Sequence, residues 1–450
     1  IESNKTPKRY CDELTLVFKS LWSKLNIHYD YFIRTTDDYH VKAVKEVLNQ
    51  LYQKGDIYLD EYDGWYCTPC ERFWTEKDLE QGKCPDCGRE VQQIREKNYF
   101  FKMSRYQDWL IDHIHKNPKF IVPEYRKNEV LGFLRNQLND LCVSRPKSRL
   151  TWGIELPFDS DYVCYVWFDA LLNYVTGPGF LRDEKQFKKI WPADYHLIGK
   201  DILTTHAVYW PIMLKSLDIE PPKSILAHGW WLVEQTKMSK SRGNIIQPLD
   251  LMDKYGVDEF RYFLMKEMTL GQDSNFSEES FIDKINSDLA NDLGNLANRI
   301  NKMTLSYLQG NLKKPKFFND IDNELIKKCK SLNNLIPSLY DDLKLNLMLE
   351  EIMNIIRSVN RYLEMTAPWK MSKENDLESL NRTLYTANTV LCGTGLLLKP
   401  VMPEKINRML NFLGIRDETN QISETVKIFE QEEYVITKAN PLFPRIDKAE

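Results

Sequence analysis

Apolar residues near the start of the chain recur in steps of three and four, as they do along one face of a helix. The first such stretch has apolar positions at Leu14, Val17, Phe18, Leu21, Trp22 and Leu25. A second stretch has them at Val41, Val44, Leu48 and Leu51 and ends near Gly55, where a left-handed helix cap forms easily. The segment DIYLDEYDGWYC that follows is typical of a strand. The pattern therefore predicts two helices and then a strand.

The middle of the chain alternates short apolar runs with helical stretches. The runs YVCYVWF, YHLIG and SILAHGWWLV come after Trp152, and the helical stretch DILTTHAVYWPIMLK separates the last two. Such alternation predicts an α/β domain with a parallel sheet. We expect residues 118–149, just before these runs, to be helical and to end in polar residues.

Beyond Phe276 the spacing becomes that of long amphipathic helices. The first of them has apolar positions at Phe281, Ile285, Leu289, Leu293, Leu296 and Ile300. Nearly everything up to Leu413 has the same character. The pattern therefore predicts a second domain that is entirely α-helical.

Composition narrows the classes of protein that fit. With 450 residues, of which 42% are apolar, the chain exceeds what one hydrophobic core usually organises. A net charge of −4 excludes a protein that coats nucleic acid with its whole surface, but it is compatible with a local basic face. No apolar run reaches the roughly 18 to 20 residues of a membrane helix, and the first residues do not resemble a secretion signal. We expect a soluble, cytoplasmic protein with no membrane partner, and an organellar location stays open.

Four of the nine cysteines form two CxxC pairs, Cys67 with Cys70 and Cys84 with Cys87. Each pair lets two sulfurs converge on one ion from a tight turn, and nearby glycine and proline residues supply the turns. The spacing predicts a tetrahedral zinc site with four thiolates and no open position, which is a structural site. Iron in the same cage is the chemical alternative.

The segment KMSKSRGN, residues 237–244, places two lysines and two serines ahead of a glycine. A loop of this kind can close over a polyphosphate, where Lys237 and Lys240 would stabilise the charge that builds on the departing group. The alternative is a solvated turn, because runs of charge usually just face water. The surrounding sequence has to decide between them.

Several segments resemble the class I aminoacyl-tRNA synthetases and, among them, the methionyl-tRNA synthetases. KMSKS followed by YGVDEFRYFLM is similar to the second signature of the class, and HLIGKDI, YVWFDALLNY and the CxxC pairs resemble the corresponding methionyl segments. NDLGNLANR and APW resemble the anticodon-binding motifs of that family. The resemblance spans nearly the whole chain. It implies an α/β, class I Rossmann-like nucleotide-binding domain with a zinc-knuckle insert, followed by an all-α anticodon-binding helix bundle.

One family signature is missing from the sequence. Class I enzymes carry an earlier His-x-Gly-His segment, and none of the early histidines fits it: His28, His40, His113 and His115. We expect the N-terminal part of the nucleotide-binding domain, with that signature, to be absent from this chain. Adenylate formation by the chain as it stands is then expected to be strongly impaired.

The resemblance also assigns residues to the two small substrates. The methionine pocket is expected to contain Trp167, Ala170, Tyr174, Ile202, His206 and Trp210. Contacts to ATP are expected from Gly199, Asp201, His228, Gly229, Lys237, Ser239 and Lys240. An aromatic box suits a polarizable thioether, and His206 and Trp210 lie four apart on one expected helix face. Without the resemblance, such aromatic residues are ordinarily part of a core.

A third group of residues is expected to read the tRNA anticodon. Asn295 and Arg299 are four apart on the long helix and can reach one base edge, and Trp369 offers a stacking plane. The alternative is an ordinary polar helix face with a core tryptophan.

The resulting hypothesis is a monomeric ligase that activates methionine with ATP and Mg²⁺, passes it to tRNA(Met) and carries structural Zn²⁺. The compact insert favours methionine over valine, isoleucine or leucine, because class I ligases for those carry a large editing domain there. Two alternatives stay open, a non-catalytic tRNA- or zinc-binding protein and another class I ligase, such as one for cysteine. The expected boundaries are 1–55 for the remainder of the first Rossmann half, 56–149 for the insert, 150–235 for the second half, 236–280 for the KMSKS-bearing stem-contact region and 281–450 for the anticodon-binding domain with a tail that folds back.

Overall fold

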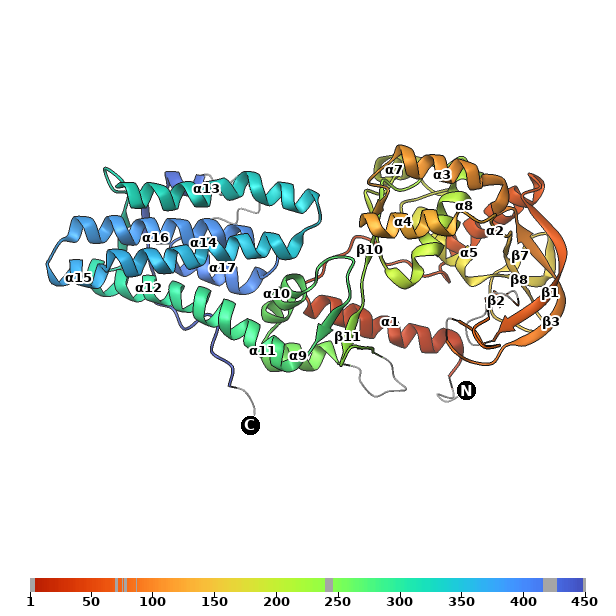
Figure 1. Cartoon of the computed structure of the whole chain (residues 1–450), viewed down its shortest axis with the longest axis horizontal. Coiled ribbons are helices and arrows are strands. Elements are labelled where there is room, and N and C mark those ends of the chain that lie inside the picture. Colours follow the sequence, from red (N-terminus) through yellow and green to blue (C-terminus); the bar gives the residue numbers. More distant parts are fainter. Residues whose placement is uncertain are drawn as a thin grey trace. The chain divides into compact units, whose positions relative to one another are not determined.

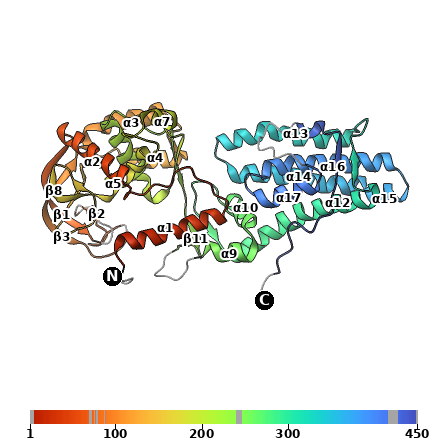
Figure 2. The same cartoon turned by 180° about the vertical axis from the view of Figure 1, so that it is seen from behind.

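The computed structural model describes residues 5–68, 72–74, 76, 79–85, 87–238, 246–415 and 427–447. They form two compact units (Figures 1 and 2). We call Tyr29–His228 the α/β unit, and the residues up to His28 together with those from Gly229 onward the helical unit. The mixed α/β architecture with a helical C-terminal region is confirmed. The finer division into five domains stays a prediction, although residues up to His28 group with the helical unit and not with the nucleotide-binding fold.

A parallel sheet organises the α/β unit. β9 (Tyr195–Gly199) and β10 (Ser224–His228) pair in parallel, and β4 (Ile121–Val122) adds to the other side of β10. All but the last residue of β10 are buried, as expected for a parallel strand covered on both faces. The predicted parallel sheet is therefore present.

The helices of this unit lie around the sheet, and α3, α4 and α7 are close together in both views (Figures 1 and 2). The helices are α2 (Asp38–Gln53), α3 (Gln107–Lys116), α4 (Glu124–Phe133), α5 (Val166–Leu171), α6 (Asn173–Thr176), α7 (Glu184–Ile190) and α8 (Trp210–Ser216), with shorter turns at η2 (Met103–Tyr106), η3 (Lys200–Ile202) and η4 (Thr205–Tyr209). The predicted cap after α2 is confirmed, since Gly55 has a φ of +74°.

Antiparallel strands make up the rest of the α/β unit. The predicted strand is β1 (Ile57–Cys67), which pairs with β3 (Gln92–Phe101) in a sheet of order β2-β1-β3-β5, where β2 is Arg72–Trp74 and β5 is Leu141–Cys142. A second sheet has the order β6-β8-β7, with β6 at Ser144–Pro146, β7 at Glu155–Leu156 and β8 at Asp159–Cys164.

Two local predictions for this unit were wrong. Residues 118–149 are helical only in α4, and the end of this stretch forms β5 and β6, because the Val143 N–H donates to the Tyr99 carbonyl at 2.8 Å. The run YVCYVWF is a strand only as far as Cys164, and Tyr165 then caps α5. In the first place a partner distant in sequence decided the backbone conformation, and in the second the strand ends where its pairing with β6 ends, at Cys164.

The helical unit is built from long helices with a small sheet at its start. The sheet has the order β12-β11-β13, with β11 at Trp231–Val233, β12 at Thr236–Lys237 and β13 at Ser274–Phe276. The helices are α1 (Pro7–Lys24), α9 (Pro248–Tyr255), α10 (Val257–Glu267), α11 (Glu278–Lys284), the π-helical η6 (Ile285–Gly294), α12 (Asn295–Leu308), α13 (Asp320–Asp341), α14 (Leu345–Thr366), α15 (Pro368–Lys373), α16 (Leu377–Leu398) and α17 (Pro403–Phe412). The remaining pieces are β14 (Asn311–Lys313), η7 (Ile428–Glu430) and β15 (Glu433–Val435).

The predicted apolar stripe drives the packing of this unit. α11, η6 and α12 run on without a break, and the predicted stripe from Phe281 to Ile300 is buried. Figure 1 shows α14, α16 and α17 beside this long helix, and α13 on the far side of α14 and α16. Across the described parts of the chain, no helix combines the length and apolar character that a membrane crossing requires.

The first predicted helix, α1, is present but buries none of its residues. Its C-terminal end joins the helical unit, because Arg261 donates from Nη1 to the Leu25 carbonyl at 2.7 Å and Asn26 donates to Glu404 at 3.0 Å. Leu21 and Leu25 pack partly against the core of that unit. The sequence stripe predicted the helix but not how little of it is covered.

Candidate functional site

Three residues predicted to contact ATP meet at one edge of the parallel sheet. β9 ends at Gly199 and β10 ends at His228, and these two residues are partners in register. A Cβ built on Gly199 would lie 2.6 Å from Oδ1 of Asp201 and 3.8 Å from Cε1 of His228. The carboxyl ends of parallel strands are where open α/β sheets bind ligands. Glycine at position 199 therefore leaves the space that the Asp201 carboxylate occupies at this edge.

Gly229 belongs to the helical unit and is required to be glycine by its own neighbours. A Cβ at this position would lie 2.1 Å from the backbone oxygen of Gln272. The next residue, Trp230, donates its N–H to Oδ1 of Asp273 at 2.9 Å. This close approach of two backbone segments explains the glycine, and its contact with ATP stays a prediction.

Five rings gather on the α/β unit, and we call Trp167, Tyr174, His196, His206 and Trp210 the aromatic cluster. The Tyr174 ring centroid lies 5.6 Å from that of His206 and 6.0 Å from that of Trp210. Trp167 meets His206 edge to face at 6.2 Å, and His196 stacks on Tyr174 at 4.1 Å. The structure thus brings together the four aromatic residues that were predicted to bind methionine, and it adds His196 to them.

The hydrogen bonds of His206 define its tautomer. Nδ1 lies 3.0 Å from the Ile202 carbonyl, which can only accept, so Nδ1 carries the proton. In the neutral ring Nε2 is then an acceptor, and the Tyr174 hydroxyl donates to it, with 3.0 Å between oxygen and nitrogen. His206 lies in the π turn η4, a rare local conformation that is frequent at functional sites.

The aromatic cluster is electrically neutral. Burial lowers the pKa of His206, and burial lowers the pKa of His196 to about 4, helped by repulsion from a charge on His206. Burial likewise raises the pKa of Tyr174. Near neutral pH all three groups are uncharged, so the cluster offers the soft aromatic surroundings that a thioether prefers.

The two other residues predicted to bind methionine, Ala170 and Ile202, lie next to members of the aromatic cluster. Ala170 lies three residues after Trp167 on α5, and its carbonyl accepts from the side chain of Asn173. The Ile202 carbonyl holds His206, as described above.

A buried histidine fixes the helices that carry Trp167 and Tyr174. Nε2 of His40 lies 2.8 Å from Oδ1 of Asp169 on α5, and Nδ1 lies 2.8 Å from Oγ1 of Thr176 on α6. No local pattern in the sequence predicts these contacts, because Asp169 and Thr176 lie 129 and 136 residues from His40 along the chain. His196 could have been found, since the alternation in YHLIG sets it on the same side of the strand as the buried Ile198.

The lysine loop lies largely outside the described residues. The backbone of Lys237 ends the two-residue strand β12, which pairs with β11 opposite Leu232. Ser239 and Lys240 fall in the part of the chain that is not described. Their roles, and that of the Lys237 side chain, therefore stay predictions.

Three of the four predicted metal ligands form a sulfur cluster. The Sγ atoms of Cys67, Cys84 and Cys87 all lie within 4.8 Å of one another, and those of Cys67 and Cys87 are 3.6 Å apart. Thiolates around a tetrahedral zinc ion at about 2.3 Å stand about 3.8 Å from each other, so the spacing fits a shared ion. Cys70 lies outside the described residues. The cluster could hold a metal ion.

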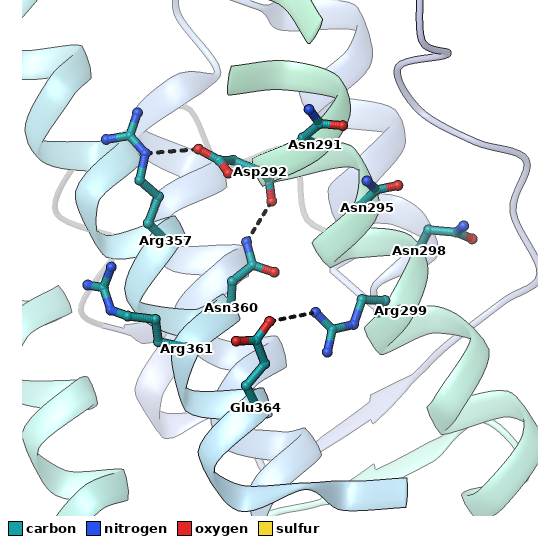
Figure 3. A pocket seen from close by; sticks show the side chains of 9 residues that line it. All are labelled: Asn291, Asp292, Asn295, Asn298, Arg299, Arg357, Asn360, Arg361 and Glu364. Atoms are coloured by element: carbon teal, nitrogen blue, oxygen red, sulfur yellow. Dashed lines mark hydrogen bonds and ion pairs between the residues drawn. The ribbon is translucent and has the colours of Figure 1, made fainter. Parts of the chain in front are cut away.

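Two predicted anticodon residues, Asn295 and Arg299, line a pocket of about 510 Å³ between η6, α12 and α14 (Figure 3). We call it the polar pocket, and its walls are Asn291, Asp292, Asn295, Asn298, Arg299, Arg357, Asn360, Arg361 and Glu364. Arg299 faces Glu364 at 4.0 Å across the pocket, and the Asn360 amide donates to the Asp292 carbonyl at 3.0 Å. Trp369 is not among the lining residues; it is half-buried on α15, five residues after Glu364.

Arg357 anchors the charged wall of the polar pocket. It donates to Asp292 at 2.8 Å and to Glu350 at 2.8 Å, and Glu350 also accepts from Lys266 of α10. Burial alone would raise the pKa of Glu350, but the hydrogen bonds from Lys266 and Arg357 outweigh it and lower that pKa to about 2. Arg357 is therefore held in the wall by a neighbouring carboxylate that stays ionised at neutral pH.

Comparisons with known proteins agree with this arrangement. The model of the family described as "tRNA synthetases class I (M)" matches residues 1–96 and 89–301. The "Methionine--tRNA ligase" of Clostridium perfringens is 46% identical over 456 residues, covering 100% of this chain and 70% of that protein. The one from Caldanaerobacter subterraneus is 44% identical over 448 residues, covering 99% of this chain and 70% of the relative.

A solved structure gives the same result for the fold. The Mycobacterium tuberculosis methionyl-tRNA synthetase in complex with methionyl-adenylate superposes with a TM-score of 0.93 at 39% identity, over 99% of this chain and 88% of that one. The free form of the same enzyme gives a TM-score of 0.90 at 38% identity, over 98% of this chain and 88% of the other. The chain therefore belongs to the methionine branch of the class I tRNA synthetases.

Proposed function

We propose that this chain activates L-methionine with ATP to methionyl-adenylate, releasing pyrophosphate, and transfers the methionine to tRNA(Met). One observation supports the proposal: residues predicted to contact ATP and residues predicted to contact methionine lie together in one short stretch. Gly199 and Asp201 lie at the sheet edge. Ile202 follows Asp201 directly, and its carbonyl accepts from His206 of the aromatic cluster. A thioether held by the cluster and a nucleotide held at the edge would therefore meet.

The reaction asks for alignment more than for acid–base catalysis. The methionine carboxylate is already ionised, so it can attack the α-phosphorus of ATP directly while the bond to the pyrophosphate oxygen breaks. The neutral aromatic cluster would hold the side chain, and Gly199, Asp201, His228 and Gly229 would contact the nucleotide. Mg²⁺ accompanies ATP in this class, and Lys237, Ser239 and Lys240 would neutralise the leaving pyrophosphate.

We propose that the sulfur cluster binds structural Zn²⁺ with Cys70 as fourth ligand. Support comes from the spacing of the three described sulfurs and from the purely thiolate donor set. Cys84→Ser should reduce the bound zinc, measured by elemental analysis of the purified protein, to well below one ion per chain. Cys11→Ser changes an exposed cysteine outside the cluster and should leave the zinc content unchanged. Equal zinc in both variants would contradict the assignment.

We further propose that the polar pocket receives a base of the anticodon, read by Asn295 and Arg299 with Trp369 as a stacking plane. The pocket offers amide and guanidinium groups in a concave surface, which is how single-stranded bases are commonly recognised. We take the active form to be a monomer, which sedimentation of the charged complex would test.

Methionine-dependent exchange between pyrophosphate and ATP tests the central proposal on the natural polypeptide. Exchange with methionine, and much less with cysteine, is the expected result. No exchange would leave only a non-catalytic tRNA- or zinc-binding protein, and cysteine activity above methionine activity would replace the assignment with a ligase for cysteine.

A further inference from the structure

His196 is the member of the aromatic cluster to which neither the sequence pattern nor the family resemblance gave a role. It is the second residue of β9, where exposed Tyr195 and Leu197 alternate with buried His196 and Ile198. Its side chain is therefore directed to the covered side of the sheet and is only 3% exposed. Three residues later the same strand ends at Gly199, at the sheet edge that is proposed to contact ATP.

Two contacts define what the imidazole does there. The indole N–H of Trp210 donates to Nε2 of His196 at 3.0 Å. The Tyr174 ring stacks on the imidazole with centroids 4.1 Å apart and planes 24° apart. Trp210 is completely buried and has only this one side-chain donor, so removal of the acceptor would leave a buried donor unsatisfied.

The stack also determines how Tyr174 is presented. One face of its ring lies on His196, and its hydroxyl is committed to Nε2 of His206. The ring plane and the hydroxyl are thereby fixed from two sides, by two imidazoles on different elements. A ring fixed in advance loses less conformational entropy when a ligand arrives, which is the usual source of affinity in a preorganised site.

We propose that His196 is a positioning residue that sets the selectivity of the site for a thioether side chain, acting through Tyr174 and Trp210. This inference rests on the proposed function of the aromatic cluster as the methionine pocket. His196 does not need to touch the ligand. It holds the two rings that would touch it, one by stacking and the other by accepting its N–H.

The two contacts can be removed separately. His196→Phe keeps a flat ring beside Tyr174 but loses the acceptor, whereas His196→Gln keeps an acceptor for Trp210 but loses the ring. The chain offers a matched control in His113, a half-buried histidine of α3 that stacks on Trp109 at 5.3 Å, far along the sequence from the cluster. His113→Phe should test the general effect of replacing a packed imidazole in this unit.

The measurement, again on the natural polypeptide, is methionine-dependent pyrophosphate exchange, with KM and kcat for methionine and for norleucine, in which a methylene replaces the sulfur. For both His196 variants we expect the methionine KM to rise about tenfold with kcat within about threefold, and the preference over norleucine to fall by a similar factor. The KM for ATP and the values for His113→Phe should stay within about twofold of the parent. Titration of tryptophan fluorescence with methionine gives the dissociation constant for a variant that folds but turns over poorly.

A double-mutant cycle tests the mechanism. Trp210→Phe removes the indole N–H that His196 accepts. In that background, His196→Phe should change the logarithm of the methionine affinity by less than half as much as it does in the parent. The proposal would be overturned if methionine affinity and selectivity stayed unchanged in both His196 variants, or if they fell equally in His113→Phe. His196 would then be an ordinary packing residue. A parent protein without any methionine-dependent exchange or binding would instead overturn the proposed function, and this inference with it.

Discussion

The aromatic cluster of the α/β unit keeps its titratable groups neutral, whereas beside the polar pocket of the helical unit a carboxylate, that of Glu350, is kept charged. In the cluster, burial lowers the pKa of His196 to about 4, and ring stacking and hydrogen bonds between neutral groups maintain the order. Beside the pocket, Arg357 of its wall and Lys266 of α10 hold Glu350 ionised, with its pKa lowered to about 2. The difference matches the proposed ligands, since a thioether carries no charge and a nucleic acid does. It also means that substitutions and changes of pH should affect the two sites differently.

The largest effect is expected for Trp210→Ala in the cluster. The side chain is fully buried, so its removal leaves a cavity and should lower the free energy of unfolding by about 3–5 kcal/mol. Urea unfolding followed by circular dichroism measures the loss. Trp152→Ala is the control, because that ring is 47% exposed and should cost less than about 1 kcal/mol. Similar losses in the two variants would show that the cluster is not tightly packed.

The next effect is a dependence of stability on pH that belongs to the cluster. The unfolded His196 takes up a proton near its usual pKa of 6.5, but the folded one resists protonation until about 4. The contribution of His196 to the free energy of unfolding is therefore fully present above pH 6.5. It falls by something on the order of 2 kcal/mol as pH falls from about 6.5 to 4. His196→Gln should flatten this part of the stability profile. An unchanged slope in that variant would contradict the neutral cluster.

A smaller effect is expected for Arg357→Gln in the polar pocket. It leaves Asp292 and Glu350 without their shared partner, but the Arg357 side chain is 29% exposed, so water screens the loss to about 1–2 kcal/mol. The depressed pKa of Glu350 contributes stability above pH 4.5 that is lost as pH falls toward 2, and the variant should lose part of this contribution. Arg361→Gln, one turn further along α14 and hydrogen-bonded to Ser358, is the matched control and should behave like the parent.

The smallest effect on stability is expected for Asn295→Ala and Trp369→Ala. Both side chains lie outside the main core, so the free energy of unfolding should change by less than about 1 kcal/mol. If the polar pocket reads a base, tRNA charging should still fall while pyrophosphate exchange stays nearly intact. Parallel loss of both activities would mark these residues as structural.

The sequence by itself determined the elements with strong local signals. The 3.6-residue stripe from Phe281 to Ile300 predicted the long helix, because period and burial are encoded within a few neighbours. The apolar runs YHLIG and SILAHGWWLV predicted strands in the same way, and the second run forms two of them, β10 and β11. The CxxC pairs predicted the sulfur cluster for the same reason, since three of those cysteines do converge. The family motifs predicted which residues would gather, and the rings of Trp167, Tyr174, His206 and Trp210 did so.

Only the tertiary structure decided the contacts between segments distant along the chain. Residues 141–146 became strands because β3 and β8 supply hydrogen-bond partners there, against a pattern that favoured helix. His40 holds α5 and α6, and Arg357 joins Asp292 to Glu350, through side chains whose partners no local period reveals. The tautomer of His206 and the neutrality of His196 likewise depend on burial and on the groups that surround each ring. Local periodicity encodes which residues face a core, but only the assembled fold determines which of them meet and what charge they carry.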